Sequence, residues 1–298
     1  MTPTSRRRII RTGIGLLVLY LAVVLWGWMT SWRRLPYFEV DPELALASPI
    51  MSGAAYGEVI DTHPRPCVFR VEAERGAVLI YGAEHTKDPA DPALDGIRRE
   101  WKAFGPTVAL CESRLGVLFP QFMDPVREFG EPGLVHALAR ERDIPTYTWE
   151  PTPAVFMAHL LRQPFTKEQL ALRLKLGACF SNLRHGRPDD PAAFLADAIG
   201  DGTKWPGLEN TLPTAQDIDR EWKRQFPDGP DWRDVSDQFG LPGFLADIET
   251  NAPRDEHFAR VVVTLARQGH RVFAIAGSSH AVKLEAALRD TLETVTLK

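Results

Sequence analysis

The sequence predicts an α/β fold: a mostly parallel sheet flanked by helices, with a large helical insertion, preceded by one N-terminal transmembrane helix. Short apolar runs alternate with amphipathic helical patterns before and after the middle of the chain. The middle itself, about residues 153–250, has mostly helical patterns broken by Pro and Gly. A single long apolar run without charge lies near the N-terminus, at residues 12–32.

The composition is that of an ordinary globular protein with a sizeable core. The chain has 298 residues, of which 44% are hydrophobic and 25% are charged. The formal net charge is −4, without the basic balance that is typical of nucleic-acid-binding proteins. We therefore expect no nucleic-acid partner.

The strands and helices are predicted from the spacing of apolar residues. Two short apolar runs separated by Glu74-Arg75-Gly76 indicate a hairpin, and later runs are typical of strands buried on both faces. The predicted strands are residues 68–72, 77–81, 107–111, 144–149, 271–276 and 294–297. The predicted helices are residues 91–104, 132–142, 253–268 and 281–289, with a further helix opened by a capping-box pattern at Thr166 and Gln169.

Residues 12–32 have the properties of a membrane anchor. A helix needs about 20 predominantly apolar residues to cross a bilayer, and this run contains no charged residue. Trp26, Trp28 and Trp32 lie at one end, where their rings favour the headgroup layer. We therefore expect the lipid bilayer to be a partner of this helix.

The flanking arginines predict the orientation. More arginines precede the run than follow it, so the N-terminus should be cytoplasmic. The expected organisation is a cytoplasmic tail at 1–11, the anchor at 12–32, a linker and domain edge at 33–66, and the α/β domain at 67–298. The anchor would cross the inner membrane once and leave the α/β domain in the periplasm. A cleaved signal peptide, twin-arginine export and the opposite orientation are the alternatives.

An ionisable residue follows each of four predicted central strands: His85, Glu112, Glu150 and His280. The carboxyl ends of parallel strands meet at one edge of a sheet, where open α/β folds bind ligands. We therefore expect these four side chains to share one cleft. Each one alone is more typical of a structural residue, so the prediction depends on their combination.

Both histidines end a Gly-x-x-His segment that directly follows an apolar strand. A glycine after a strand permits a tight turn and a close backbone approach. Two neutral imidazoles with one or two carboxylates form a ligand set suited to Zn, Mn, Co or Fe. A bound ion would lower the pKa of its water and supply a nucleophile. Glu84 or Glu150 could then act as general base, and Arg254 could hold a substrate carboxylate or orient a ligand.

The same residues resemble the TraB/GumN/TIKI family, which is related to the ChaN and erythromycin-esterase-like proteins. The resemblance covers roughly residues 70–295 as an order of elements, and its specific matches are Gly82, His85, Glu112, Glu150, Arg254, Gly277 and His280. It implies an α/β domain with a helical insertion and, by similarity to TIKI, a metal-dependent protease that uses Mn or Co. The chain departs from the family pattern at Ala83-Glu84, where small or hydroxylated residues are usual, and at Asp255, where Asn is usual.

We therefore expect a membrane-anchored, metal-dependent hydrolase, such as a peptidase, that acts on a peptide or small-molecule substrate. His85, Glu112 and His280 are the expected metal ligands, and Glu84, Glu150 and Arg254 the expected catalytic residues. One alternative is a non-catalytic haem-, metal- or peptide-binding protein on the same scaffold. Another is a metal-free esterase that uses His85 as its base. The HExxH, P-loop, GxGxxG and GxSxG motifs are absent from the sequence.

Overall fold

The chain forms two compact units. The computed structural model describes residues 3–41, 43–181, 190, 193, 196, 199–200, 204–233 and 242–293. The first unit combines Met1–Glu150 with Phe258–Lys298, and the second is Pro151–His257.

The first unit contains a five-stranded sheet in the order β1-β2-β5-β3-β4. β1 pairs with β2 as an antiparallel hairpin, and the other pairs are parallel. The strands are β1 (Cys67–Glu72), β2 (Ala77–Ala83), β3 (Val108–Cys111), β4 (Thr146–Thr148) and β5 (Arg271–Gly277). The predicted α/β class with a mostly parallel sheet is therefore confirmed.

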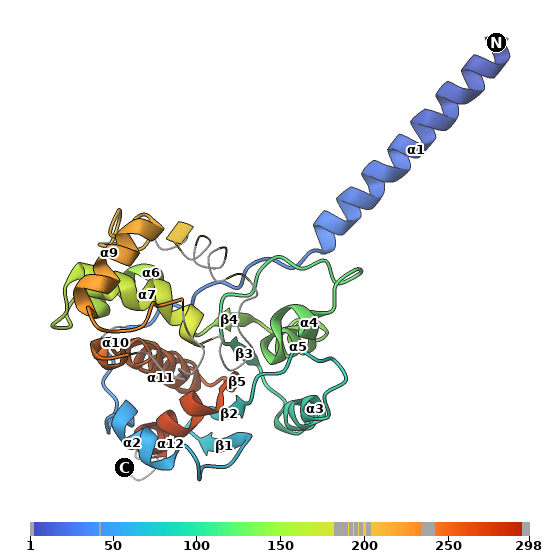
Figure 1. Ribbon diagram of the computed structural model, residues 1–298. Helices are drawn as coiled ribbons and strands as arrows, with labels where there is room; N and C mark the ends of the chain where they lie inside the picture. Colours follow the sequence, from blue (N-terminus) through green and yellow to red (C-terminus); the bar gives the residue numbers. More distant parts are fainter. Residues whose placement is uncertain are drawn as a thin grey trace. The chain divides into compact units, whose positions relative to one another are not determined.

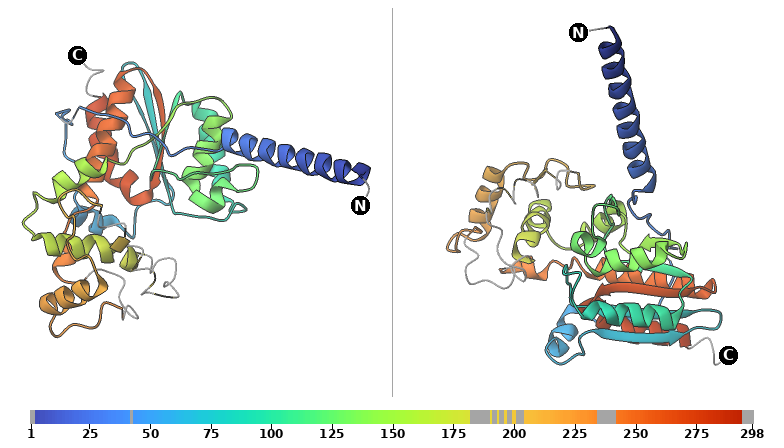
Figure 2. Two further views of the ribbon diagram at one scale, coloured as in Figure 1. Left: turned by 90° about the horizontal axis from the view of Figure 1, so that it is seen from above. Right: turned by 90° about the vertical axis from the view of Figure 1, so that its right-hand side faces the viewer.

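Helices cover both faces of this sheet because successive strand residues point to opposite sides. On one face, Ile80 and Leu110 pack with α12 (Ser278–Glu293) and with the part of α11 (Ala252–Arg267) from Phe258 onward. On the other face, Leu79 and Phe273 pack with α3 (Ala93–Phe104) and α5 (Glu131–Arg140), next to the short α4 (Pro125–Phe129). Figures 1 and 2 show the sheet between these two layers.

The second unit is helical in its described residues and has its own apolar core. Its helices are α6 (Pro153–Leu160), α7 (Lys167–Ser181), α9 (Ala215–Gln225) and α10 (Phe244–Asp247). The capping box predicted for α7 is confirmed, because Thr166 and Gln169 each accept a hydrogen bond from the other's backbone N–H. Trp222 and Trp232 are buried in this core, in keeping with a packing role.

The N-terminal part of the chain contains α1 (Pro3–Thr30) and α2 (Gly53–Val59). Within the part of the chain that the structure describes, no helix combines the length and the apolar character needed to cross a membrane. The anchor predicted at residues 12–32 therefore has no support from the described helices. The helix α2 lies in the segment that was predicted to be a linker.

One difference from the predicted elements affects the site. The helix predicted at residues 281–289 is α12, which begins at Ser278, directly after β5. His280 therefore lies in the first turn of a helix and not in a loop. The last strand, predicted at residues 294–297, lies outside the described residues.

Candidate functional site

The sheet register brings three predicted site residues together at the carboxyl ends of the parallel strands. Ala83 at the end of β2 lies opposite Gly277 at the end of β5. Cys111 at the end of β3 lies opposite Ile275 on the other side of β5. His85, Glu112 and His280 follow these strand ends and meet around Gly277.

Glu112 is held in place by the backbone of β5. Its N–H donates to the carbonyl of Ile275 at 3.2 Å. Its Oε2 accepts a hydrogen bond from the N–H of Gly277 at 2.7 Å. Its Oε1 lies 3.8 Å from Nε2 of His280. The carboxylate therefore links the ends of two neighbouring strands and faces one of the two imidazoles.

His85 is exposed and has a backbone φ of 69°. This left-handed conformation is uncommon for residues other than glycine and is concentrated at functional sites. A Cβ atom on Gly277 would lie 2.7 Å from Nε2 of His85 and 3.8 Å from Oε2 of Glu112. The absence of a side chain at Gly277 is therefore what lets the imidazole approach the end of β5.

His280 is buried, with 5% of its surface exposed. Its ring packs edge-on against Trp149, with 5.1 Å between the ring centroids. Trp149 is fixed in turn, because its indole N–H donates to the carbonyl of Ile275 at 3.0 Å and its ring stacks on Phe258. Trp149, which our sequence analysis did not assign to the site, positions His280 against Glu112.

The predicted catalytic residues are less closely grouped. Glu150 follows β4, and its Oε1 accepts the N–H of Ser113, the residue after Glu112, at 3.3 Å. Glu84 is exposed beside His85. Arg254 belongs to the second unit, where its Nη1 donates to Oδ1 of Asn251, so its role at this site stays a prediction.

Two possible nucleophiles have structural roles instead. The hydroxyl of Ser278 donates to the carbonyls of Gly82 and Ala83 at 3.0 and 2.9 Å, which ties the start of α12 to the end of β2. Burial raises the pKa of the Cys111 thiol, which reduces its nucleophilicity near neutral pH. Neither residue provides the exposed, activated group that covalent catalysis requires.

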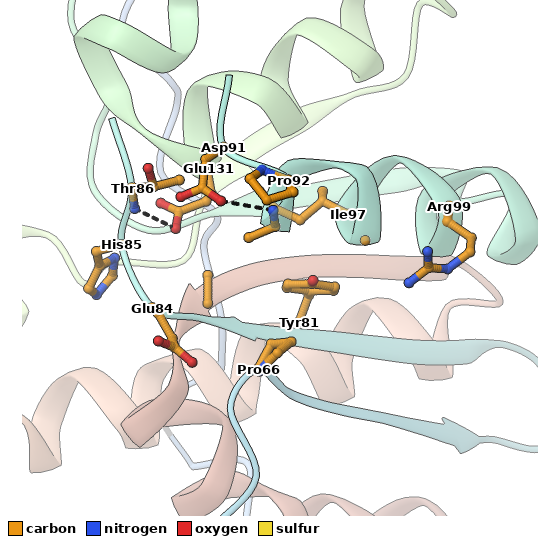
Figure 3. Close-up of a pocket in the computed structure, with 13 residues that line it drawn as sticks. Pro66, Tyr81, Glu84, His85, Thr86, Asp91, Pro92, Ile97, Arg99 and Glu131 are labelled. Atoms are coloured by element: carbon orange, nitrogen blue, oxygen red, sulfur yellow. Dashed lines mark hydrogen bonds between the residues drawn. The ribbon is translucent and has the colours of Figure 1, made fainter. Parts of the chain in front are cut away.

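A pocket of about 550 Å³ opens beside His85. Figure 3 shows that His85 and Glu84 line it together with Tyr81 from β2 and Glu131 from the start of α5. Thr86 joins the two sides, because its N–H donates to Oε1 of Glu131 at 2.8 Å. Tyr81 and Glu131 were not predicted from the sequence, since Tyr81 looks like an ordinary strand residue and Glu131 like a helix-start carboxylate.

The side chains of His85, Glu112 and His280 are of the types that bind divalent metals, two imidazoles and a carboxylate. Among the described residues, however, no group of three His, Cys, Asp or Glu side chains is arranged to hold a metal ion. The edge of the sheet thus presents metal-type ligands without a closed coordination shell.

No family model matches the chain, and comparisons with curated proteins and with solved structures found no match.

Proposed function

We propose that this protein is a divalent-metal-dependent hydrolase of the TraB/GumN/TIKI type. The observation that carries the proposal is the meeting of His85, Glu112 and His280 around Gly277, at the ends of three neighbouring strands. The carboxyl ends of parallel strands form the edge at which open α/β folds bind ligands. Two imidazoles and a carboxylate are ligands of Zn, Mn, Co and Fe.

In this proposal the site residues have three roles: metal binding, positioning of the ligands, and catalysis. His85, Glu112 and His280 would hold the ion, which supplies a water of lowered pKa when bound. Trp149 and the N–H of Gly277 orient His280 and Glu112 before any ligand arrives. Glu84, exposed beside the pocket, or Glu150 would accept the proton of the attacking water, and Arg254 would provide a cation for the substrate.

The exposure of His85 supports a second candidate. Its imidazole borders the pocket, and the described residues contain no closed metal cluster. A metal-free esterase could use this imidazole as a general base. In that case Glu112 and His280 would stabilise the strand ends without binding an ion.

Metal-dependent stability of the full-length, chelator-treated protein distinguishes these candidates. Mn, Co, Zn or Fe is added to the native protein, to His85→Ala and to His280→Ala, and Tm is measured. His270→Ala is the matched control, because His270 precedes the first residue of β5 at the opposite end of that strand. A ligand at 100 times its Kd adds about 2.7 kcal/mol of stability.

We expect one ion to raise Tm of the native protein and of His270→Ala at concentrations that leave Tm of both site variants unchanged. No response to any ion, or an equal response of all four proteins, would contradict the metal site. Ester hydrolysis that survives chelation would favour the esterase. A ligand retained without turnover would favour a binding protein.

We also propose that residues 12–32 anchor the chain in the inner membrane with the α/β domain in the periplasm. Support comes from the uncharged run, its flanking arginines and the exposure of its apolar side chains, such as Leu16 at 63% and Leu19 at 62%. The full chain should remain in the membrane fraction after alkaline carbonate extraction, and protease added to the periplasm should digest the domain. Release by carbonate, or full protection from the protease, would argue against the anchor.

A further inference from the structure

The pocket beside His85 has an acidic lining. Three carboxylates border it, from Glu84, Asp91 and Glu131, against the single guanidinium of Arg99. Arg99 offsets only part of this charge, because its side chain is 74% exposed and its Nε lies 3.9 Å from Oε1 of Glu100. Figure 3 places Arg99 and His85 on opposite sides of the view. The end of the pocket near His85 therefore carries the negative charge.

Glu131 is the strongest of these groups because it is both buried and fixed. Only 4% of its surface is exposed. One oxygen, Oε1, accepts the N–H of Thr86, and the described part of the chain supplies no hydrogen-bond donor for the other oxygen. Glu131 is also the first residue of α5, where the helix dipole favours a negative charge. A carboxylate oxygen that lines a pocket without a protein donor favours a cationic partner.

Tyr81 provides a second, independent polar group in the same pocket. It is 4% exposed, and no hydrogen-bond partner of its hydroxyl occurs among the described residues. Helix α3 leaves room for this hydroxyl at Gly96, where a Cβ would lie only 2.6 Å from it. Burial, together with the carboxylates of Glu100 and Glu131, raises the pKa of Tyr81 against the opposing effect of Arg99, so the phenol stays neutral. A neutral hydroxyl can accept a hydrogen bond from an ammonium group.

We propose that this pocket recognises a protonated amine of the substrate. The ammonium group would donate to the open oxygen of Glu131 and to the hydroxyl of Tyr81, and Asp91 and Glu84 would add to the attraction. Thr86, which holds Glu131, is the residue after His85, so a bound amine would place the rest of the substrate beside the imidazole. The inference rests on the proposed hydrolase only for this last step.

Binding of three matched probes to the full-length, chelator-treated protein tests the inference without turnover or metal. Nα-acetyl-lysine methylamide carries a side-chain ammonium, norleucine methylamide carries an α-ammonium, and Nα-acetyl-norleucine methylamide is neutral. We expect at least one ammonium probe to bind at least about tenfold more tightly than the neutral probe, as a charged hydrogen bond implies. The probe that binds identifies which amine the pocket selects.

Variants assign the preference to the pocket. Glu131→Gln removes the charge but keeps an oxygen for the N–H of Thr86, and it should abolish the preference. Tyr81→Phe should reduce the preference for the ammonium probe by about threefold to tenfold. This variant also tests the pocket if Glu131→Gln fails to fold. Glu128→Gln, at an exposed residue of α4 outside the lining, is the matched control.

Equal binding of neutral and ammonium probes would overturn the inference, and so would a preference that survives both pocket variants. Because no metal is present, these outcomes are independent of the ion-dependent stability that tests the hydrolase.

Discussion

The two Gly-x-x-His segments have the same spacing after neighbouring parallel strands, yet their histidines lie in different environments. His85 is exposed in a left-handed loop beside the pocket. His280 is buried in the first turn of α12 against Trp149 and Glu112. The spacing after a strand therefore fixes the position of each histidine along the sheet edge but not its exposure or its role.

The glycines of the two segments also have different neighbours, although each makes room for a residue of the other segment. A Cβ on Gly82 would lie 2.6 Å from Cβ of Ala281, on the helix that carries His280. A Cβ on Gly277 would lie 2.7 Å from Nε2 of His85. Gly82 is thus part of the packing of α12, and Gly277 is part of the site. Four predictions extend this comparison, from the largest expected effect on stability to the smallest.

His280→Ala should have the largest effect. It leaves a cavity beside Trp149 and removes the imidazole that faces Glu112, so we expect a loss of about 2–3 kcal/mol in the free energy of unfolding. His85→Asn is the matched control, because Asn tolerates the left-handed conformation and the side chain is exposed, and it should cost less than about 0.5 kcal/mol. Chemical denaturation measures both, and similar losses would contradict the contrast.

His136 is a second buried histidine, and like His280 it packs edge-on against a tryptophan, here Trp32. Burial, aided by the nearby charge of Arg140, lowers the pKa of His136 from 6.5 to about 4. The unfolded chain therefore takes up a proton before the folded protein does, and stability is lost as the pH falls from 6.5 toward 4. We expect this histidine to contribute about 1–3 kcal/mol of that loss.

Denaturation of the native protein and of His136→Leu across this pH range measures the contribution. Leu cannot be protonated, so the variant should lose less stability than the native protein on acidification. Parallel curves would show that His136 is not the cause.

Gly82→Ala should be moderately destabilising, because the new methyl group would meet Ala281 and the backbone carbonyl of Cys67, neither of which can move away easily. We expect a loss of about 1–3 kcal/mol. The free energy of unfolding measured in denaturant would show it, and an unchanged value would mean that α12 does not pack closely on β2.

Gly277→Ala should have the smallest effect on stability, below about 1 kcal/mol, because the exposed ring of His85 can swing away. Its effect on function should be large. With His85 displaced, affinity for the activating ion should fall by about tenfold to a hundredfold. Ion titrations followed by Tm give both quantities, and the reverse pattern would assign Gly277 to packing.

The fold was largely predictable because its central strands β2, β3 and β5 are mostly apolar runs and helices such as α3 are amphipathic. The hairpin, the parallel strands and the capping box at Thr166 are all confirmed. The start of α12 was placed three residues late, since Ser278 and Ser279 resemble a turn in the sequence. The hydroxyl of Ser278 in fact bonds to the backbone of β2, which is a tertiary contact that periodicity cannot predict.

The sequence predicted which residues follow the strand ends, but not how their side chains are arranged around one another. The strand order, which inserts β5 between β2 and β3, depends on long-range pairing and brings Glu112 to the N–H of Gly277. Trp149, Tyr81 and Glu131 were missed because their roles depend on neighbours that are distant in sequence. Arg254 remains a prediction.

The central claim is that Gly277 acts by seating His85 in a shared metal site, and a double-mutant cycle tests it most directly. The affinity for the activating ion is measured in the native protein, Gly277→Ala, His85→Ala and the double variant. The claim predicts that Gly277→Ala adds less than about 0.5 kcal/mol once His85 is absent, because both changes remove the same interaction. Fully additive losses, or full affinity in His85→Ala, would contradict it.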